Sequence, residues 1–468
     1  MADQTDNTKG ELRAQWISPG DVLSLLLLIG GDIVQKAIAQ LVGRTIQPFK
    51  GSKLEIGIAP VAFSFGWVAY AFTNLLSAVG EKQLMPTADQ PSIAVNCENA
   101  FARSNQSWAL ARLLRDYESG HEIDARGGDS IRIDIFELGV HSKPSIDNVW
   151  WLGWLTMMVQ IGIAIVPWVL HGDWGIMMVL LCGTFMALLT CALPQWRDEK
   201  WAGRILNSDK VMCLTRGNGH YHIMVIIGRA GAWDIETLAT ATRAPRPETT
   251  IVSLILTVLW TCLLISVSGL KANSWYLIGV GGLGMLQNIY AAGVERQPGT
   301  SDFHLMEYSP MPTIIGKRRH VPKDDANPVV ELDENKAEFS ELSEWAKREG
   351  DDKIPEWLDS MDGSHGMPEW LTPVSKRPGG GGQIENVHGA LMELERWVPT
   401  AGIAMLQVFF PAGLSYRDEA VKYNFHKKFW KRAYHVSKIR RKAEEKKRGI
   451  RRTQQAAKQE QEAVKGMP

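Results

Sequence analysis

The stretch that decides the fold is WWLGWLTMMVQIGIAIVPWVL, residues 150–170, which a short HGD link joins to WGIMMVLLCGTFMALLTCAL, residues 174–193. Neither run contains an Asp, Glu, Lys or Arg residue. A bilayer core about 30 Å thick needs about 20 apolar residues in a helix, because every backbone N–H and C=O must be paired inside the segment. Both runs meet this requirement, so residues 150–193 are predicted to form a helical hairpin that crosses a membrane.

Further runs of the same kind extend this pattern along the chain. Ile56–Val79 and Ile251–Leu270 contain no charged residue. Trp275–Val294 is also uncharged, but it carries Gln287, Asn288 and a cluster of glycines, which predicts close packing against neighbouring helices. Several tryptophans lie at or just beyond the ends of these runs, where amphipathic rings prefer the membrane–water interface. These runs therefore predict three more spans.

A sixth run, residues 22–42, has two interpretations, because Asp32 and Lys36 follow its apolar first half one helical turn apart. In the first, the two side chains form an ion pair inside the bundle, where charged residues are usually functional. In the second, which we favour, this half is an amphipathic helix at the membrane surface and its charges meet water. The sequence therefore predicts five or six transmembrane helices.

The long polar segments are predicted to lie on one side of the membrane, because the links inside the two later hairpins are tight. Basic residues near the ends of the runs favour the cytosol for segments 81–149, 194–250 and 295–468. The sequon Asn105-Gln106-Ser107 argues for the lumen, where alone it could be glycosylated. We expect these segments and the C-terminus to be cytosolic.

Two of these polar segments have the patterns of a small folded domain. Residues 130–136 alternate between isoleucine and polar residues, as a half-buried strand requires. In the second segment, the turn Arg216-Gly217-Asn218-Gly219 separates two apolar runs, and Asn-Gly at such a place signals a β-hairpin. Because each segment alone is near the size at which independent stability becomes marginal, we expect them to merge into one small α+β domain against the membrane.

The predicted fold class is an α-helical integral membrane protein with five or six transmembrane helices, a small membrane-proximal α+β domain formed from two inter-span loops, and a partly disordered C-terminal tail. In chain order the predicted units are a polar N-terminus (1–21), a first helical hairpin (22–80), an α+β segment (81–149), a second helical hairpin (150–193), a hairpin-helix segment (194–250), a third helical hairpin (251–294), an acidic linker (295–382), a helix with an apolar run (383–415) and a basic helical tail (416–468).

The charged C-terminal part suggests partners rather than chemistry. The basic tail is typical of a helix that lies on anionic lipid, or of one that pairs with the acidic linker of the same chain. Membrane anchoring disfavours nucleic acid as its partner. Pro-Glu-Trp-Leu occurs twice, ending at Trp357-Leu358 and Trp370-Leu371, and each copy suits a short helix that docks into a groove of this chain or of a protein partner.

Overall composition excludes several classes. The 51 basic and 51 acidic residues cancel, so net charge identifies no partner. The five cysteines show no CxxC spacing, and only Cys97 and Cys213 lie outside the apolar runs, which argues against a disulfide scaffold or a zinc ribbon. We predict no catalytic residue, no cofactor and no metal site.

The candidate functional residues are polar groups inside the apolar runs and one glycine-rich turn. The possible lining of a pathway through the bundle comprises Asp32, Lys36, Asn74, Gln160, Gln287 and Asn288. The turn Arg216-Gly217-Asn218-Gly219 could form an anion-binding nest, although a plain hairpin turn is the stronger interpretation. His220 and His222 with Cys213 would make an incomplete metal site. The GxGxxG pattern at 279–284 lacks the βαβ unit of a dinucleotide site.

Five short runs resemble a family of uncharacterised multi-pass membrane proteins of filamentous ascomycete fungi. These runs are Ile17–Leu23, Pro60–Trp67, Ala192–Trp196, Leu214–Gly219 and Gly281–Met285. The similarity extends from about Ile17 to Val294, with a weaker echo at Ala390–Glu395 and Phe409–Pro411. The resemblance brings no substrate, cofactor or catalytic residue with it.

The sequence favours a non-enzymatic membrane anchor or scaffold that carries a cytosolic domain, because so much of the chain lies outside the apolar runs. The alternative is a small-solute transporter or channel that uses the polar residues of the spans. The absence of charge in most spans counts against this alternative.

Overall fold

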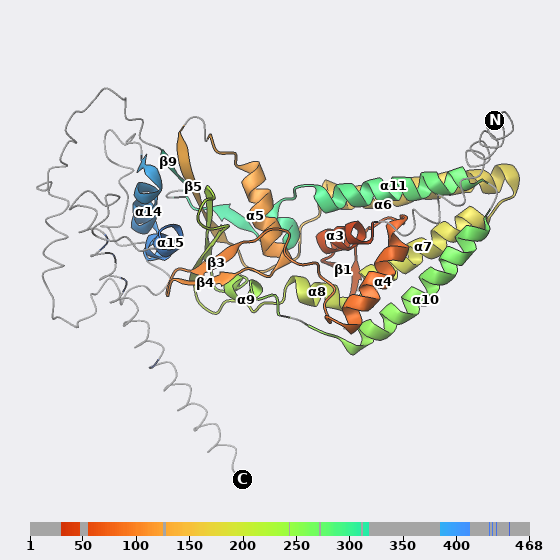
Figure 1. The fold of residues 1–468 in the computed structure, drawn as a ribbon, viewed down its shortest axis with the longest axis horizontal. Coiled ribbons are helices and arrows are strands. Elements are labelled where there is room, and N and C mark those ends of the chain that lie inside the picture. Colours follow the sequence, from red (N-terminus) through yellow and green to blue (C-terminus); the bar gives the residue numbers. More distant parts are fainter. Residues whose placement is uncertain are drawn as a thin grey trace, which may run out of the picture.

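The computed structural model describes residues 30–46, 55–124, 128–242, 244–270, 273–309, 312–317 and 384–411, together with Trp430, Ala433, Ser437 and Gly449. Figure 1 shows an elongated arrangement, with a mixed β-sheet and its helices toward one end and a helical bundle toward the other. The two parts are not separate segments of the sequence, because the chain leaves the bundle for the sheet and returns several times.

The bundle is built on long helices that the uncharged runs form. Its main elements are α6 Asn148–His171, α7 Gly175–Cys191, α8 Pro194–Lys200, α10 Pro247–Gly269 and α11 Ser274–Gly293. Helix α6 begins where the Asp147 carboxylate accepts a hydrogen bond from the backbone N–H of Trp150 at 3.1 Å. It ends at Gly172, whose φ of 70° suits a residue without a side chain.

The long helices form two arms that diverge from the end of the bundle far from the sheet (Figure 1). Helix α11 packs on α6, whereas α10 packs on α7 and on α4, Gly66–Val79. Helix α3, Gly31–Leu41, contacts both α11 and α4. The wedge between the arms is thus filled by α3, α4 and the segment that connects the short strands β1 and β2, Arg44–Ile46 and Ile56–Ile58, to α4.

The prediction of five or six spans is wrong. Among the described residues, two helices, α6 and α10, are long and apolar enough to cross a membrane. A third qualifies only if α7 and α8, which meet at a bend of 43°, count as one broken span. The described residues also contain a large α/β part, so the fold is not that of a simple multi-span helical protein.

The surplus spans fail for separate reasons. The run Ile56–Val79 divides into a strand, an extended stretch and the 14-residue helix α4. Helix α11 has 20 residues, but its amides and glycines make it less apolar than α6 and α10. In the doubtful run, the described part is the 11-residue helix α3, and residues 22–29 lie outside the description.

The sheet has the order β10-β9-β5-β7-β6-β3-β4, and β8 pairs with the second half of β5. The strands are β3 Ile93–Asn96, β4 Phe101–Ser104, β5 Asp129–Leu138, β6 Lys210–Thr215, β7 His222–Gly228, β8 Leu305–Glu307, β9 Thr313–Lys317 and β10 Ile384–Glu385. Strands β6 and β7 form an antiparallel hairpin across the glycine-rich turn. The central pair β5 and β7 is parallel.

Helices cover both faces of this sheet. Helices α5, Trp108–Gly120, and α9, Ile235–Leu238, share one apolar core with the sheet. Helices α14, Asn386–Trp397, and α15, Ala401–Phe409, share the core on the other face. The expected small domain of two loops is therefore corrected, because strands from 305–317 and 384–385 and helices from the C-terminal part complete it.

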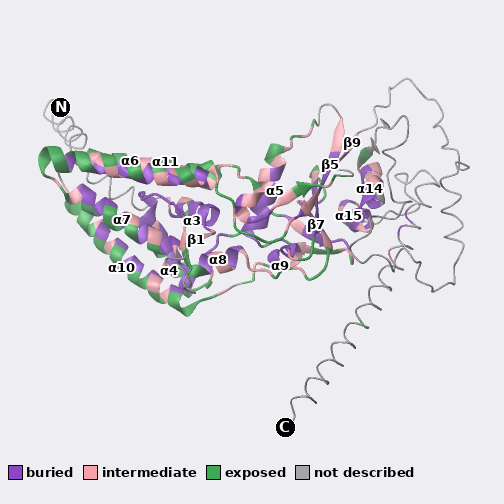
Figure 2. Cartoon of the chain, turned by 180° about the vertical axis from the view of Figure 1, so that it is seen from behind, coloured by how far each residue is buried: buried purple, intermediate pink, exposed green. Residues whose placement is uncertain are grey.

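The outer surface of the bundle is apolar. Figure 2 shows exposed positions along the outward sides of the long helices. Large hydrophobic side chains occupy many of them: Leu155, Met158, Val159, Val169 and Leu170 on α6, Leu181 and Phe185 on α7, and Ile251, Leu254, Ile255 and Val258 on α10. Water-soluble proteins rarely expose contiguous apolar surface on this scale, whereas a lipid environment favours it.

Exposed tryptophans lie near both ends of α6. Trp151 and Trp168 are 60% and 51% exposed. Their separation of 17 positions corresponds to a rise of about 25 Å along a helix, which is close to the thickness of the hydrocarbon core, about 30 Å. Trp174, directly before α7, and Trp275, in the first turn of α11, are also exposed. This spacing fits rings that mark the two membrane–water interfaces.

Candidate functional site in the bundle core and at its junction with the sheet

An extended segment, 59–65, enters the bundle core before α4 begins at Gly66. Every residue in it is buried. Pro60 has no N–H to donate, and the backbone between it and Gly66 is not helical, so its polar groups need partners from elsewhere. At membrane depth such backbone is stable only where protein or a water-filled cavity surrounds it.

Side-chain amides from α6 and α11 supply these partners. The Gln287 Oε1 atom accepts a hydrogen bond from the N–H of Ala62 at 3.1 Å. The Asn288 Nδ2 atom donates to the Ala62 carbonyl at 3.3 Å and to the Ser64 hydroxyl at 2.8 Å. The Gln160 Nε2 atom donates to the carbonyls of Phe63 at 2.7 Å and Val280 at 2.8 Å. Three of the six polar residues predicted inside the spans thus converge on one segment.

Glycines make room for this segment. A Cβ atom on Gly284 would lie 1.8 Å from the Phe63 carbonyl oxygen, and one on Gly153 would lie 2.1 Å from that of Pro60. On Gly281 it would meet the Phe65 ring at 2.3 Å. The glycines therefore allow segment 59–65 to pack closely against α6 and α11. The GxGxxG pattern lies inside helix α11, so it has no strand-turn-helix context.

Three amide atoms in this core have no hydrogen-bond partner among the described residues: Gln160 Oε1, Gln287 Nε2 and Asn288 Oδ1. All three side chains are at least 96% buried. Each of these atoms is able to make one further hydrogen bond, for example with a water molecule. No carboxylate or ammonium group joins them through a described contact, so the arrangement offers hydrogen bonding rather than acid–base chemistry.

The other predicted span residues lie elsewhere. Asn74 on α4 accepts from the Tyr70 hydroxyl at 3.2 Å and donates to the Ser253 hydroxyl on α10 at 3.1 Å, which joins the two helices. Asp32 is exposed. Lys36 pairs with Asp89 at 3.5 Å, between α3 and the segment before the sheet. The structure thus brings together Gln160, Gln287 and Asn288 and separates them from Asp32, Lys36 and Asn74.

Two buried charged residues lie at the end of α8, where the chain leaves the bundle for the sheet. The Lys200 Nζ atom donates to the carbonyls of Gln40 at 3.3 Å and Val42 at 2.9 Å, at the C-terminal end of α3. A cation suits that end of a helix, where carbonyl groups lack partners. The Glu199 carboxylate accepts from the N–H groups of Leu84 and Met85, both at 2.8 Å. Each side chain holds a different loop against α8.

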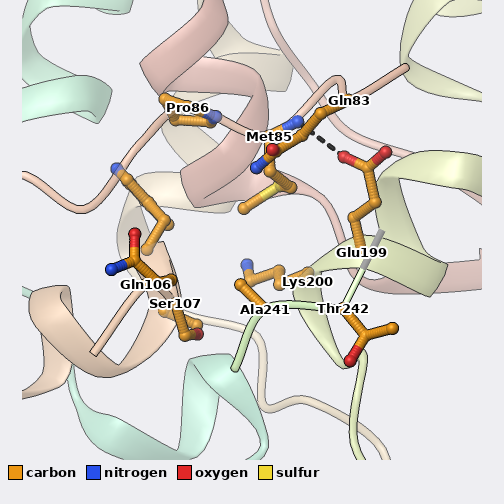
Figure 3. Close-up of a pocket in the computed structure, with 11 residues that line it drawn as sticks. Gln83, Met85, Pro86, Gln106, Ser107, Glu199, Lys200, Ala241 and Thr242 are labelled. Atoms are coloured by element: carbon orange, nitrogen blue, oxygen red, sulfur yellow. Dashed lines mark hydrogen bonds between the residues drawn. The ribbon is translucent and has the colours of Figure 1, made fainter. Parts of the chain in front are cut away.

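A small pocket lies beside these residues (Figure 3). Its walls are Gln83, Met85, Pro86, Gln106, Ser107, Trp108, Ala109, Glu199, Lys200, Ala241 and Thr242. The Glu199 carboxylate is turned toward the backbone around Met85 (Figure 3). The space open to the centre of a water molecule is about 10 Å³, about what one water needs. The pocket in this form has room for one water molecule and is too small for an organic substrate.

A buried arginine reinforces the same junction. Arg112 on α5 donates to the Asp89 carboxylate at 2.8 Å, and its guanidinium group lies 5.2 Å from the centre of the Trp108 ring. Burial, with a smaller effect of Arg115, lowers the pKa of the Arg112 guanidinium. Because Asp89 also pairs with Lys36, a single carboxylate connects α5 to α3.

Asp302 gathers the loops between the sheet and the bundle. Its carboxylate accepts from the Trp233 indole at 2.8 Å, from the N–H of Ser142 at 3.1 Å and from His141 Nδ1. His304 Nε2 lies 3.2 Å from Asp302 and 2.7 Å from the Ser142 hydroxyl. A Ser–His–Asp triad needs the two ring nitrogens to face different partners. Here one nitrogen faces both, so the cluster is a structural hub and not a nucleophile site.

The predicted turn and metal candidates have other partners. Arg216 forms an ion pair with Glu118, and Gly217 and Gly219 adopt φ angles of 95° and 90° in the hairpin turn. Cys213 lies opposite Val225 rather than His222, so the hairpin does not have the register in which Cys213 would lie opposite His222 in the incomplete metal site. Among the described residues, no group of three or more His, Cys, Asp or Glu side chains could hold a metal ion.

The two Pro-Glu-Trp-Leu copies, with Trp357, Leu358, Trp370 and Leu371, lie outside the described residues, as do the acidic linker beyond Lys317 and nearly all of the basic tail. Sequence reasoning missed Lys200, Arg112 and Asp302. Lys200 resembled an ordinary basic residue at a span end, and nothing in its neighbourhood along the chain indicates burial.

Comparison of the chain with protein-family models, curated proteins and solved structures finds no match. The candidate site is therefore interpreted from its geometry.

Proposed function

We propose that this protein is a non-enzymatic membrane anchor that holds an α/β domain in a fixed orientation at the cytosolic face. The observation that carries the proposal is the junction, where buried charged side chains tie the bundle to the sheet. Arg112 on α5 binds Asp89, which also pairs with Lys36 on α3. Arg296, after α11, forms hydrogen bonds with Asp147 at 2.7 Å, just before α6.

Buried contacts of this kind favour a rigid junction. A charge removed from water loses several kcal/mol of hydration unless its partners stay in place. Movement of the domain against the bundle would separate the Arg112–Asp89 pair from Lys36, and Arg115 of α5 from the carbonyls of Gly293 and Val294 at the end of α11. A domain that only needed a tether would not require such contacts, so they support a role in which orientation matters.

The cytosolic orientation rests on basic residues near the helix ends and on the state of Asn105. That side chain is 3% exposed. Its Nδ2 atom donates to the Ser92 hydroxyl at 3.0 Å and to the Ser107 carbonyl at 3.1 Å. A glycan would replace one of the two hydrogens on this nitrogen and would need space that the buried side chain does not have, so the sequon does not support a luminal domain.

Selective permeabilisation tests the orientation. In Asn218→Cys the new thiol lies in the exposed hairpin turn, whereas Cys97, Cys191 and Cys213 are buried. We expect a membrane-impermeant maleimide to label this variant once digitonin opens the plasma membrane and leaves internal membranes sealed. Asn218→Ser controls for the native cysteines. Labelling that requires full solubilisation, or that occurs on intact cells, would place the domain on the opposite side.

A second candidate function, passage of a small polar solute, is favoured by one observation. The extended segment 59–65 interrupts the helical bundle, and the amide atoms beside it without partners are suited to hydrogen bonding. Discontinuous backbone in a membrane bundle often lines the path of a transported species. Osmotic swelling of proteoliposomes with glycerol or urea tests this candidate. Faster swelling than in empty liposomes, abolished by Gln160→Leu, would favour transport over anchoring.

A further inference from the structure

Two buried cysteines meet in the core of the sheet. Cys213 lies on β6, and Cys97 directly follows β3, the neighbouring antiparallel strand. The backbone N–H of Cys97 donates to the Val211 carbonyl at 3.1 Å, so the ladder continues to this residue. Cys97 and Cys213 are therefore diagonal neighbours on one face. Their Sγ atoms are 3.4 Å apart.

We infer that Cys97 and Cys213 are a redox-active pair. They form a disulfide with each other by exchange with a low-molecular-weight disulfide such as oxidised glutathione. One thiolate attacks a sulfur of the glutathione disulfide and releases one glutathione thiolate. The other cysteine, after losing its proton, attacks the protein sulfur of the mixed disulfide and releases the second glutathione. The two protein sulfurs lose two electrons, and one glutathione disulfide becomes two thiols.

Burial of the two thiols limits when this reaction can occur. Helices α14 and α15 share the apolar core that contains both sulfurs, and the pair is at most 2% exposed. The hydrogen bond with Cys213 and burial raise the pKa of the Cys97 thiol well above its ordinary value. A buried, protonated thiol reacts slowly. Exchange therefore requires α14 and α15 to move away from this face of the sheet.

The bond would also connect two segments that are far apart in the chain. The two cysteines are 116 positions apart, and α5, β5 and the helices α6 to α8 lie between them in the chain. A disulfide would close this long loop and restrict the unfolded chain. The oxidised protein should therefore unfold at a higher temperature than the reduced protein.

Intact-mass spectrometry tests the inference. The full chain in detergent is incubated with excess oxidised glutathione, the free thiols are alkylated under denaturing conditions, and peptides are mapped. We expect a Cys97–Cys213 linked peptide that reduction removes, together with a raised midpoint of thermal unfolding. Cys97→Ala and Cys213→Ala should each abolish the linked peptide, whereas Cys191→Ala, a buried cysteine of α7, should retain it.

Two results would overturn the inference. One is complete alkylation of Cys97 and Cys213 after prolonged incubation, including at a temperature just below the unfolding midpoint, where the cover opens most often. The other is glutathione bound to each cysteine separately without a linked peptide. The inference does not depend on the anchoring role, because the linked peptide forms or fails to form wherever the domain lies.

Discussion

At the scale of single residues, close approach of backbone to backbone decides which glycines matter. On α11 a Cβ atom at Gly284 would lie 1.8 Å from the Phe63 carbonyl oxygen, whereas one at Gly282 would meet no atom within 4 Å. Both residues lie in the same helix and differ only in what faces them. The sequence shows a cluster of glycines, but only the packing separates its members.

This pair gives a matched test. We expect Gly284→Ala to destabilise the protein by about 1–3 kcal/mol through overpacking. Gly282→Ala should be neutral or slightly stabilising, because alanine favours a helix over glycine by up to about 1 kcal/mol. Thermal unfolding in detergent measures both. Equal effects of the two substitutions would contradict the seating of segment 59–65 on α11.

A second residue, Asp234, predicts a pH dependence of stability. Burial acts to raise its pKa, but hydrogen bonds from Lys210 at 2.9 Å and Arg204 at 3.0 Å outweigh burial and hold the pKa below its ordinary value. A carboxyl group with a lowered pKa in the folded state stabilises the protein above the unfolded pKa, about 3.9. That stability is lost as the pH falls through the folded pKa.

We therefore expect Asp234→Asn to lower the unfolding midpoint at pH 7 and to weaken the loss of stability below about pH 4. Melting curves between pH 7 and pH 2.5 follow both effects. The exposed Asp32, changed to Asn, is the control and should leave the pH profile as it is. An Asp234→Asn profile parallel to that of the wild-type protein would contradict the ion-pair interpretation.

At the scale of elements, segment 59–65 and helix α4 show how tertiary contacts override an apolar pattern. Ile56–Val79 has the length and composition of a span, yet it folds as a strand, an extended stretch and a short helix. Gln160, Gln287 and Asn288 satisfy the extended backbone from outside. An apolar run indicates only that the segment avoids water. It does not indicate whether the segment is helical, because the amides that bind its backbone lie far away in sequence.

The end of α3 offers a test at this scale. Lys200→Met removes the ammonium group that donates to Gln40 and Val42 and keeps a side chain of similar length. We expect a loss of about 1–3 kcal/mol from carbonyls left without a partner in a buried site. Limited proteolysis should then cut the 42–46 region sooner. Lys143→Met, at an exposed position, should change neither measure.

At the scale of the whole molecule, exposed apolar side chains cover the bundle, which has two or three helices able to cross a membrane. Ile255 on α10 and Ile205 before the sheet are 54% and 45% exposed. Both are isoleucines with similar exposure, but only Ile255 belongs to the continuous apolar surface of the bundle. We expect the first to meet lipid and the second to meet water.

Substitution by lysine should distinguish them. A lysine at the centre of a lipid-facing helix costs about 2.5–3.5 kcal/mol of insertion free energy, so Ile255→Lys should reduce the fraction of protein that resists alkaline carbonate extraction. Ile205→Lys should extract like the wild-type protein. If Ile255→Lys had no effect and the wild-type chain stayed monodisperse without detergent, the membrane assignment would be wrong.

The sequence by itself determined the features that local pattern controls. Asn218-Gly219 between apolar runs predicts the hairpin of β6 and β7, and alternation predicts β5, because turn chemistry and side-chain period act over a few residues. The uncharged runs at 150–170 and 251–270 predict α6 and α10 for the same reason. Their length and apolarity are contained in the segment itself.

Only the tertiary structure decided how many apolar runs are long helices, how the sheet is completed and which polar residues meet. Strands β8, β9 and β10 join β5 or one another from distant parts of the chain. Lys200, Asp302 and the Cys97–Cys213 pair owe their environments to residues far away in sequence. Burial and partnership depend on which segments pack together, and one-dimensional hydropathy does not contain that information.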